Sequence, residues 1–264
     1  MNRNKLLIGS VITSSLLFGA GDMAPVSTEV VEIEQSNWSF ELEPYLMATS
    51  IEGDASLGRA TGINVSVDFS DILETLQMGA MVHFEAHHNS GFGIWVDYAF
   101  MDLAQDTDGP LGGVIDVGVR QAVLEVFGLY RQPLAMGRID YMLGARWWNN
   151  DFDLEVNPSF LPGSASTDMS QDWVDIVVGA NWLYEFSPDW SVKVRGDIGG
   201  FGLESDFTAT AALGFEYAIS DLMSLDLQYK ATWVDYEDGE AGNRGSFAYD
   251  TVTHGPIVGL KFKF

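Results

Sequence analysis

Three side chains with metal-binding chemistry lie at alternate positions of the chain, at His83, Glu85 and His87. Imidazole and carboxylate groups are common ligands of divalent transition metals. In a β-strand all three would leave one face, but neighbours on that face are roughly 7 Å apart. Three ligands from one strand would need help from other strands to hold an ion. We therefore expect polar side chains that hydrogen-bond to their neighbours, and we predict no metal or cofactor site.

His254 is the remaining candidate for acid-base catalysis. Of the four histidines, it alone lies near the longer connections of the chain, with Asp235 and Asp250 as conceivable partners. A hydrolase needs such a base beside its nucleophile or attacking water. The chain has no G-x-S-x-G motif and no recognised protease or phospholipase pattern. The sequence therefore favours a protein that is not an enzyme and has no catalytic residues, with a hydrolase as a distant third function.

Acidic residues dominate the charge of the chain. Its formal net charge is −25, which argues against a nucleic-acid partner, because phosphate binding needs clustered lysine and arginine. "QDTDGPLGG" and "NNDFDLEVN" could bind Ca²⁺, or lipopolysaccharide through bridging divalent ions. "DTDG" lacks the later glutamate of a calcium loop, so hydrated acidic loops are the simpler interpretation.

The elements that carry these residues have a period of two. From Val174 to Phe186 the even positions are apolar, whereas the odd positions include Asp175, Gly179, Asn181 and Glu185. Such alternation is typical of a β-strand with two unlike faces. The same pattern recurs along the chain and predicts ten strands, at about 38–51, 77–88, 92–101, 119–131, 138–148, 174–186, 190–199, 207–220, 224–233 and 253–264.

The connections between these strands alternate in length. Short turns such as "SPDW" and "SDLM" contrast with longer segments at about 52–75, 102–116, 149–171 and 237–250. This predicts one up-and-down antiparallel domain with short turns at one end and long acidic loops at the other. If "INVSVDF" (63–69) also spanned the barrel, the count would be twelve. Within 52–75, "DFSDILETLQ" predicts a short helix, either a plug or lid in the barrel mouth or a plain surface helix.

Strand length indicates which solvent meets the apolar face. Residues 174–186 extend roughly 40 Å, and a tilt of about 40° leaves roughly 30 Å of height. An apolar membrane band of about 25 Å fits within that height, whereas strands of soluble proteins are usually shorter. A soluble lipocalin-like barrel, with its apolar face inward, is the alternative. We predict a transmembrane barrel whose apolar face meets lipid.

The polar face should then line the lumen, with charges that pair across it and leave at most a narrow water path. The predicted lumen-lining residues are Glu41, Glu43, His83, Glu85, His87, Asp97, Glu125, Asp140, Arg146, Asp175, Glu185, Lys193, Arg195, Asp197, Glu216, Asp226, Lys230, Lys261 and Lys263.

The N-terminus has the layout of a secretory signal peptide. Arg3 and Lys5 precede a mostly apolar stretch, residues 6–20, and small residues follow. We predict a signal peptide over about 1–24 and a barrel domain over 25–264. The chain has no cysteine, which excludes disulfides and an N-terminal lipid-bearing cysteine.

Three stretches resemble a known family: the final strand ending at Phe264, "VSVDFSDILETL" (65–76) and "VRGDIGGFGLESDFT" (194–208). They are similar to small outer-membrane β-barrel proteins of Gram-negative bacteria, especially the opacity-protein-like branch. The resemblance implies insertion among outer-membrane lipids and lipopolysaccharide, periplasmic short turns and termini, and extracellular loops. It also implies that Phe264 is a signal for the barrel-assembly machinery. No particular activity follows from it.

Two non-enzymatic functions remain open for such a barrel. The one that the sequence favours is a narrow, porin-like pore for small solutes, with a cation preference if the acidic rim dominates. The other is a closed structural or adhesive barrel that acts through its loops. The sequence leaves the oligomeric state undetermined.

Overall fold

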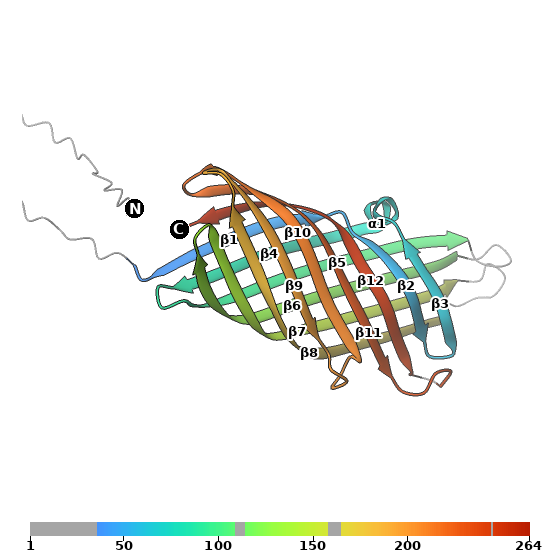
Figure 1. Ribbon diagram of the computed structural model, residues 1–264. Helices are drawn as coiled ribbons and strands as arrows, with labels where there is room; N and C mark the ends of the chain where they lie inside the picture. The colour runs from blue at the N-terminus through green and yellow to red at the C-terminus, as the bar shows by residue number, and fades with distance from the viewer. Residues whose placement is uncertain (1–35, 109–113, 158–164, 244) are drawn as a thin grey trace, which may run out of the picture. The chain divides into compact units, whose positions relative to one another are not determined.

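The computed structural model describes residues 36–108, 114–157, 165–243 and 245–264. The predicted signal peptide, residues 1–24, lies outside them. The described part is all-β apart from one short helix. Ten strands close the barrel (Figure 1): β1 (Trp38–Met47), β4 (Leu76–His88), β5 (Phe92–Asp108), β6 (Val114–Leu134), β7 (Gly137–Asn157), β8 (Ala165–Glu185), β9 (Trp190–Gly199), β10 (Phe207–Ser220), β11 (Met223–Asp238) and β12 (Phe247–Lys263).

The barrel closes between its first and last strands. Each strand pairs antiparallel with the next along the chain, and β1 pairs with both β4 and β12. Beyond β12, Phe264 donates its backbone N–H to the carbonyl oxygen of Phe40 (3.0 Å), and Phe40 donates back to Phe264 (2.9 Å). The C-terminal residue is thus hydrogen-bonded into the wall. The predicted ten-stranded, up-and-down antiparallel barrel is confirmed.

Two further strands lie outside the closed circuit. β2 (Ser50–Leu57) continues beside β12 beyond the end of β1, with Ile51 opposite Thr253, and β3 (Ala60–Val67) pairs with β2. The segment "INVSVDF" therefore belongs to a hairpin that enlarges the sheet to twelve strands without adding a barrel strand.

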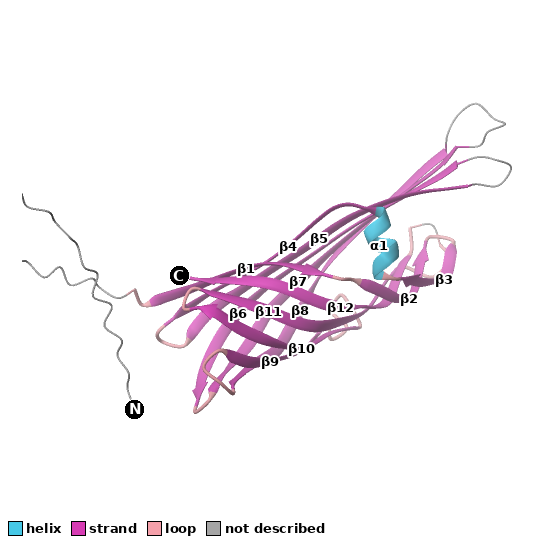
Figure 2. Cartoon of the chain, turned by 90° about the horizontal axis from the view of Figure 1, so that it is seen from above, coloured by secondary structure: helices cyan, strands magenta, loops and turns pink. Residues whose placement is uncertain are grey.

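The predicted short helix is α1 (Phe69–Thr75), which follows β3 directly. Its first turn is fixed because Asp68 donates its backbone N–H to Oδ2 of Asp71 (3.3 Å). Ile72 is buried against the inward-facing Ile51 and Met101. Figure 2 shows α1 beside the β2–β3 hairpin. Segment 52–75 thus consists of this hairpin and α1, and a plug role for it stays a prediction. The described residues contain no helix long and apolar enough to cross a membrane.

Four short connections, between β4–β5, β6–β7, β8–β9 and β10–β11, define what we call the turn end, and the opposite end is the loop end. The predicted long loops at 102–116 and 149–171 are wrong over most of their length. They are continuations of β5–β6 and β7–β8, paired out to Asp108↔Val114 and Val156↔Ala165. The strands run on because their period of two continues beyond the predicted ends.

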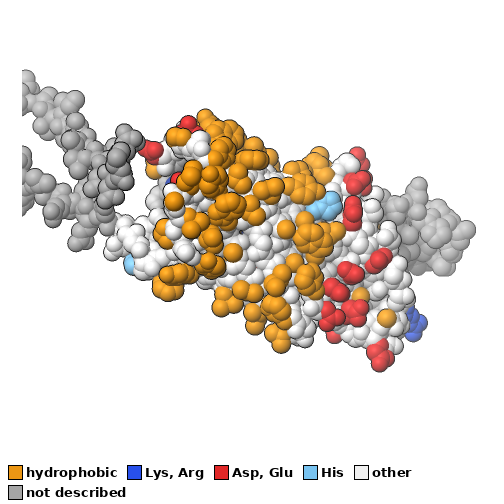
Figure 3. Space-filling model, viewed as in Figure 1, with side chains coloured by type: hydrophobic (Ala, Val, Ile, Leu, Met, Phe, Trp, Pro, Cys, Tyr) orange, Lys and Arg blue, Asp and Glu red, His pale blue; other side chains and the backbone are white. Residues whose placement is uncertain are grey.

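The outer surface changes character along the barrel axis. Over the turn-end half it carries exposed apolar side chains, such as Leu143 (63% exposed) and Leu213 (56%). At the loop end the outward positions are acidic instead, including Glu52, Asp153 and Glu237. Figure 3 shows the apolar side chains and the acidic ones on separate parts of one face. An outward apolar belt beside an acidic surface suits a barrel with one part in lipid and the other part in water.

Candidate functional site in the barrel lumen

The polar face of the strands lines the lumen, as the partners of its side chains show. Glu185 differs, because it is exposed at the turn end of β8. Glu41, Lys230 and Lys263 are partly exposed. The other predicted lumen residues are buried: Glu43, His83, Glu85, His87, Asp97, Glu125, Asp140, Arg146, Asp175, Lys193, Arg195, Asp197, Glu216, Asp226 and Lys261.

Four buried charges cross the middle of the lumen, and we call them the central layer: Glu125, Arg146, Arg195 and Asp197. Arg146 donates from Nε to Oε1 of Glu125 and from Nη2 to Oδ1 of Asp197, both at 2.8 Å. Arg195 donates to the other oxygen of each carboxylate, at 2.8 Å to Glu125 and 2.9 Å to Asp197. Two guanidinium and two carboxylate groups cancel in charge, so the layer is internally balanced.

Neighbouring side chains complete the coordination of the two arginines. Arg146 on β7 also donates to Oγ1 of Thr208 (2.9 Å) and Oγ1 of Thr210 (2.8 Å) on β10. The Arg195 guanidinium lies over the rings of Trp95 (4.9 Å) and Phe127 (5.5 Å). A guanidinium group with several charge-assisted hydrogen bonds, or with aromatic rings against it, tolerates burial that an isolated charge would not. Because each arginine reaches a strand three places away, the central layer bridges the lumen.

A second layer of charges lies nearer the turn end. Lys261 Nζ is 2.9 Å from Glu216 Oε2, 3.1 Å from Glu41 Oε2 and 3.8 Å from Glu43 Oε2. Lys263 donates to the other oxygen of Glu216 at 2.7 Å. We call these five residues the turn-end layer. It holds three carboxylates against two ammonium groups, so it is more acidic than the central layer.

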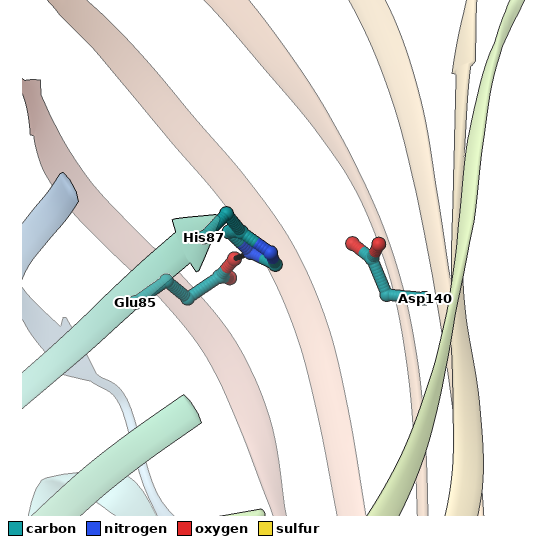
Figure 4. Close-up of side chains that lie close together, drawn as sticks. All are labelled: Glu85, His87 and Asp140. Atoms are coloured by element: carbon teal, nitrogen blue, oxygen red, sulfur yellow. Dashed lines mark hydrogen bonds and ion pairs between the residues drawn. The ribbon is translucent and has the colours of Figure 1, made fainter. Parts of the chain in front are cut away.

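His83 and Glu85 lie beside the turn-end layer, opposite Glu43 and Glu41. Figure 4 shows Glu85 and His87 together with Asp140. Glu85 Oε1 is 2.9 Å from His83 Nε2, and Glu85 Oε2 is 2.7 Å from His87 Nε2. Glu85, His87 and Asp140 offer ligand atoms within 4.8 Å of one another, a spacing suited to a metal. However, Arg131 Nη2 lies 2.7 Å from His87 Nε2, and Arg131 donates to both oxygens of Asp140 (2.7 and 2.8 Å). A guanidinium cation already stands where a metal would bind.

Smaller pairs fix the remaining inward charges. Tyr45 donates its hydroxyl to Asp97 Oδ1 at 2.9 Å. Asp175 accepts from the Ser205 hydroxyl (2.9 Å) and from the Trp173 indole (3.2 Å). Lys193 pairs with Asp226, which also accepts from Gln228.

Aromatic side chains fill the lumen toward the loop end. Trp173 stacks on Tyr236 with ring centroids 4.0 Å apart and on Trp148 at 5.7 Å. Phe247 packs against Trp173 at 6.2 Å and Tyr249 at 6.1 Å. We call these five residues the aromatic layer. It faces inward at the height where the outer surface turns acidic. Along the same strands, the apolar side chains therefore pass from the outer face to the inner face, and the acidic ones pass from the inner face to the outer face.

Small cavities separate these layers. One of about 60 Å³ lies between the aromatic and central layers and is lined by Trp148, Arg146 and Glu125, among others. Another of about 40 Å³ lies on the other side of the central layer, against Arg195 and Lys193. A third, of about 140 Å³, lies beside α1 and β6.

Sequence reasoning missed several inward-facing residues. Arg131 and Arg138 were left out of the predicted lumen-lining residues, although their positions share the inward face with Glu125 and Asp140. The inward aromatics were missed because aromatic residues were assigned to lipid. The available signal was position, since Trp148 and Trp173 alternate with Arg146 and Asp175 on the polar face.

His254, the hydrolase candidate, lies on the outer wall. Its Nδ1 is 2.8 Å from the Tyr229 hydroxyl, and its Nε2 is 3.7 Å from Glu52 Oε1. Asp235 and Asp250, its expected partners, face each other across β11 and β12. Asp250 is four residues along the strand, roughly 13 Å away, so neither carboxylate is placed to orient the imidazole.

A scan against models of known protein families finds no match, and a search of curated proteins finds none either. Solved structures do match in fold. The outer membrane protease OmpT from Escherichia coli has a TM-score of 0.52 at 10% identity, over 88% of this chain and 99% of that chain. The translocator domain of autotransporter NalP from Neisseria meningitidis follows at 0.49 and 10%, over 88% and 90%. Ail, the attachment invasion locus protein of Yersinia pestis, gives 0.38 at 8%, over 87% and 100%.

Identities near 10% establish the fold alone, and of these three structures only OmpT has a TM-score above 0.5. Its similarity agrees with the pairing of β1 to β12 that closes ten antiparallel strands here. The chain therefore has the closed, antiparallel β-barrel fold of Gram-negative outer-membrane proteins.

Proposed function

We propose that the chain is an integral outer-membrane barrel, closed at mid-height, that acts through the surfaces it presents at the loop end. The observation that carries this proposal is the central layer. Arg146, Glu125 and Asp197 are almost completely buried, and with Arg195 their bonds join β6, β7 and β9 inside the lumen. A solute passing through would have to break several charge-assisted hydrogen bonds at once.

The outer surface supports a membrane location. An apolar belt around the turn-end half removes hydrocarbon from water only if lipid covers it. The acidic outer surface above the belt needs water or counter-ions. Together these features favour a barrel whose turn end lies in the periplasm and whose loop end projects from the cell, with β5–β8 extending beyond the bilayer.

Partners follow from the same geometry. The belt would contact membrane lipids, and the acidic outer surface beside it would meet lipopolysaccharide phosphates through bridging divalent cations. Phe264, 66% exposed and bonded to Phe40 through its backbone, is available as the residue that the barrel-assembly machinery reads. The barrel would then serve as an anchor, with structural or adhesive work done at the loop end.

Single-channel recording of refolded protein in planar bilayers tests the closed barrel. We expect no current steps at voltages that a ten-stranded barrel tolerates. Reproducible steps from protein free of porin contaminants would contradict closure. Protease accessibility of intact cells tests the orientation separately, because a tag in the loop between β7 and β8 should be cleaved and a tag after Phe264 should be protected.

A narrow pore is the second candidate, and one observation favours it. The 60 Å³ and 40 Å³ cavities share Tyr45, Asp97 and Lys230 in their linings, so they adjoin along the barrel axis. The aromatic, central and turn-end layers then interrupt a water path. The same recording separates the candidates, since a narrow acidic pore would conduct with a preference for cations.

A hydrolase is disfavoured by the placement of His254. Its ring faces outward, between Tyr229 and Glu52, and neither aspartate predicted as its partner is within hydrogen-bonding range. OmpT's protease activity is a property of that protein and does not transfer at 10% identity. Alanine at His254 should leave any hydrolysis by purified protein unchanged.

A further inference from the structure

The 60 Å³ cavity between the aromatic and central layers has unmatched hydrogen-bond donors on its walls. Trp148 lines the cavity, is 2% exposed, and its indole Nε1 has no partner among the described residues. The Thr253 hydroxyl lines it too, and it also lacks a partner within the described part of the chain. Buried donors left unpaired cost free energy, so such groups usually mark the site of a ligand or water.

Lys230 adds a positive charge to the same wall. Its cross-strand neighbours are Ala212 on β10 and Gly255 on β12, which offer no side chain to pair with its ammonium group. No hydrogen bond or ion pair joins Lys230 to another described residue, in contrast to Lys193, Lys261 and Lys263. An inward-facing ammonium group beside two unmatched donors calls for an acceptor that carries negative charge.

The carboxylates in the wall do not meet that need. Glu125 is bound by Arg146 and Arg195 in the central layer, and Asp97 accepts from Tyr45. Each therefore has a donor of its own, and the surplus in the cavity is one of donors.

The rest of the wall is apolar, and it sets the size of the ligand. Met47, Met81, Met101 and Val123 line the cavity. One water takes up about 10–15 Å³ of such a cavity, so a cavity of 60 Å³ holds about four to six non-hydrogen atoms. Methionine side chains adapt readily to small differences in shape.

The cavity also reaches the barrel wall. Hydrogen bonding between β1 and β4 stops at Pro44↔Val82, although β4 continues to Leu76 and remains paired with β5. Pro44 has no N–H to donate, and interruptions of a ladder are common at proline. Met81 and Phe100 line the cavity beside this unpaired seam, and Phe100 belongs to the outward face of β5. The cavity therefore reaches the wall at a place where no β1–β4 hydrogen bonds close it.

We propose that this cavity binds a short-chain carboxylate of about four to six non-hydrogen atoms, with its carboxylate at Lys230 and Trp148 and its alkyl chain among the methionines. The site stands whether or not the barrel conducts, because entry is from the seam. It would give a closed barrel a second property, the capture of small organic acids at the outer membrane.

The test uses refolded mature protein in detergent with acetate, propionate, butyrate and hexanoate as probes, at ionic strength matched with chloride. Unfolding followed by tryptophan fluorescence reports the Tm, and saturation-transfer NMR reports contact with the probe. We expect propionate and butyrate to raise the Tm and give transfer, and hexanoate and the neutral butyramide to do neither. Two outcomes would show that the cavity holds water only. One is an equal rise in Tm with butyrate and with butyramide. The other is no rise in Tm and no saturation transfer when butyrate is at 100-fold the concentration of protein sites.

Three variants localise the response. Lys230→Met should abolish butyrate binding, whereas the matched Lys263→Met, which removes an ammonium paired with Glu216 outside the cavity, should keep it. Trp148→Phe keeps an aromatic ring but removes the indole donor and one ring of the bicyclic side chain, and it should weaken binding about tenfold or more. This last variant decides the matter if Lys230→Met does not fold. Undiminished binding in Lys230→Met or in Trp148→Phe overturns the proposal.

Discussion

Arg195 on β9 donates from Nη2 to Oε2 of Glu125 on β6 at 2.8 Å, across the middle of a barrel whose wall places two strands between them. Both side chains are buried, and Arg146 binds the other oxygen of Glu125. This contact joins strands three places apart inside the lumen, and we propose that it both stabilises the barrel and helps to block it.

Glu125→Ala should lower the free energy of unfolding by about 3–5 kcal/mol, because it leaves two buried guanidinium groups with Asp197 as their one shared carboxylate. Urea unfolding in detergent micelles would measure the loss. Asp153→Ala is the matched control, since Asp153 binds Arg120 at 3.2 Å on the exposed outer surface. Its expected cost is below about 1 kcal/mol. Similar costs for the two variants would mean that the central layer does not stabilise the fold.

Removing Glu125 and Arg195 together should open the lumen. The double alanine variant deletes one charge of each sign, and Arg146 keeps its bond to Asp197, so the remaining layer stays balanced. Planar-bilayer recordings should then show current steps that the wild-type protein lacks. The double variant Arg120→Ala/Asp153→Ala, which removes a pair on the outer surface, should remain silent. A silent lumen variant that is folded would place the block elsewhere, in the turn-end layer.

Phe264 should matter more for assembly in cells than for the stability of the finished barrel. Its backbone bonds to Phe40 survive in Phe264→Ala, and its ring is 66% exposed. We expect that variant to accumulate poorly in the outer membrane but to refold in detergent with a Tm close to wild type. Deleting Phe264 removes the backbone bonds too and should lower both. If Phe264→Ala reached wild-type levels in the outer membrane, Phe264 would have no role as an assembly signal.

Much of the lumen was predictable because, within the lipid belt, the apolar positions of each strand face lipid and the positions between them face the lumen. There, Arg146 and Asp197 must face inward if Leu143 and Ile198 face lipid. Trp148 and Trp173 escaped that argument because they lie where the outer surface meets water, so an apolar side chain at that height faces inward and not outward. The strands past Asp102 and Asn149 were assigned to loops for the same reason.

Partners across the lumen could not be predicted at all. Strand pairing follows chain order in a meander, so neighbours such as Glu125 and Arg146 were within reach of sequence reasoning. The bond from Arg195 to Glu125 depends instead on the stagger of four strands and the radius of the barrel. The same holds for the contact of Arg131 with His87, which lies two strands away, whereas Asp140 is the direct cross-strand neighbour of Arg131.

The outward belt makes a position-dependent prediction. Leu143→Arg places a charge in the apolar belt and should cost about 2–4 kcal/mol in a bilayer. Asn149→Arg, on the same face of β7 but roughly 20 Å further toward the loop end, should cost about 0–1 kcal/mol. Unfolding in phospholipid vesicles measures both. Equal costs would mean that the belt does not mark the height of the membrane.

The histidine cluster should bind a metal only after its own cation is removed. Arg131 contacts both His87 and Asp140, and no divalent ion can approach their ligand atoms while the guanidinium is there. Wild-type protein should therefore show no change in Tm with Zn²⁺ or with a chelator. Arg131→Ala leaves Glu85, His87 and Asp140 within 4.8 Å of one another, with His83 bound to Glu85, and should gain a zinc-dependent rise in Tm. Adding His87→Ala to that variant should abolish the rise. Stoichiometric zinc binding by the wild type would show instead that Arg131 gives way to the ion.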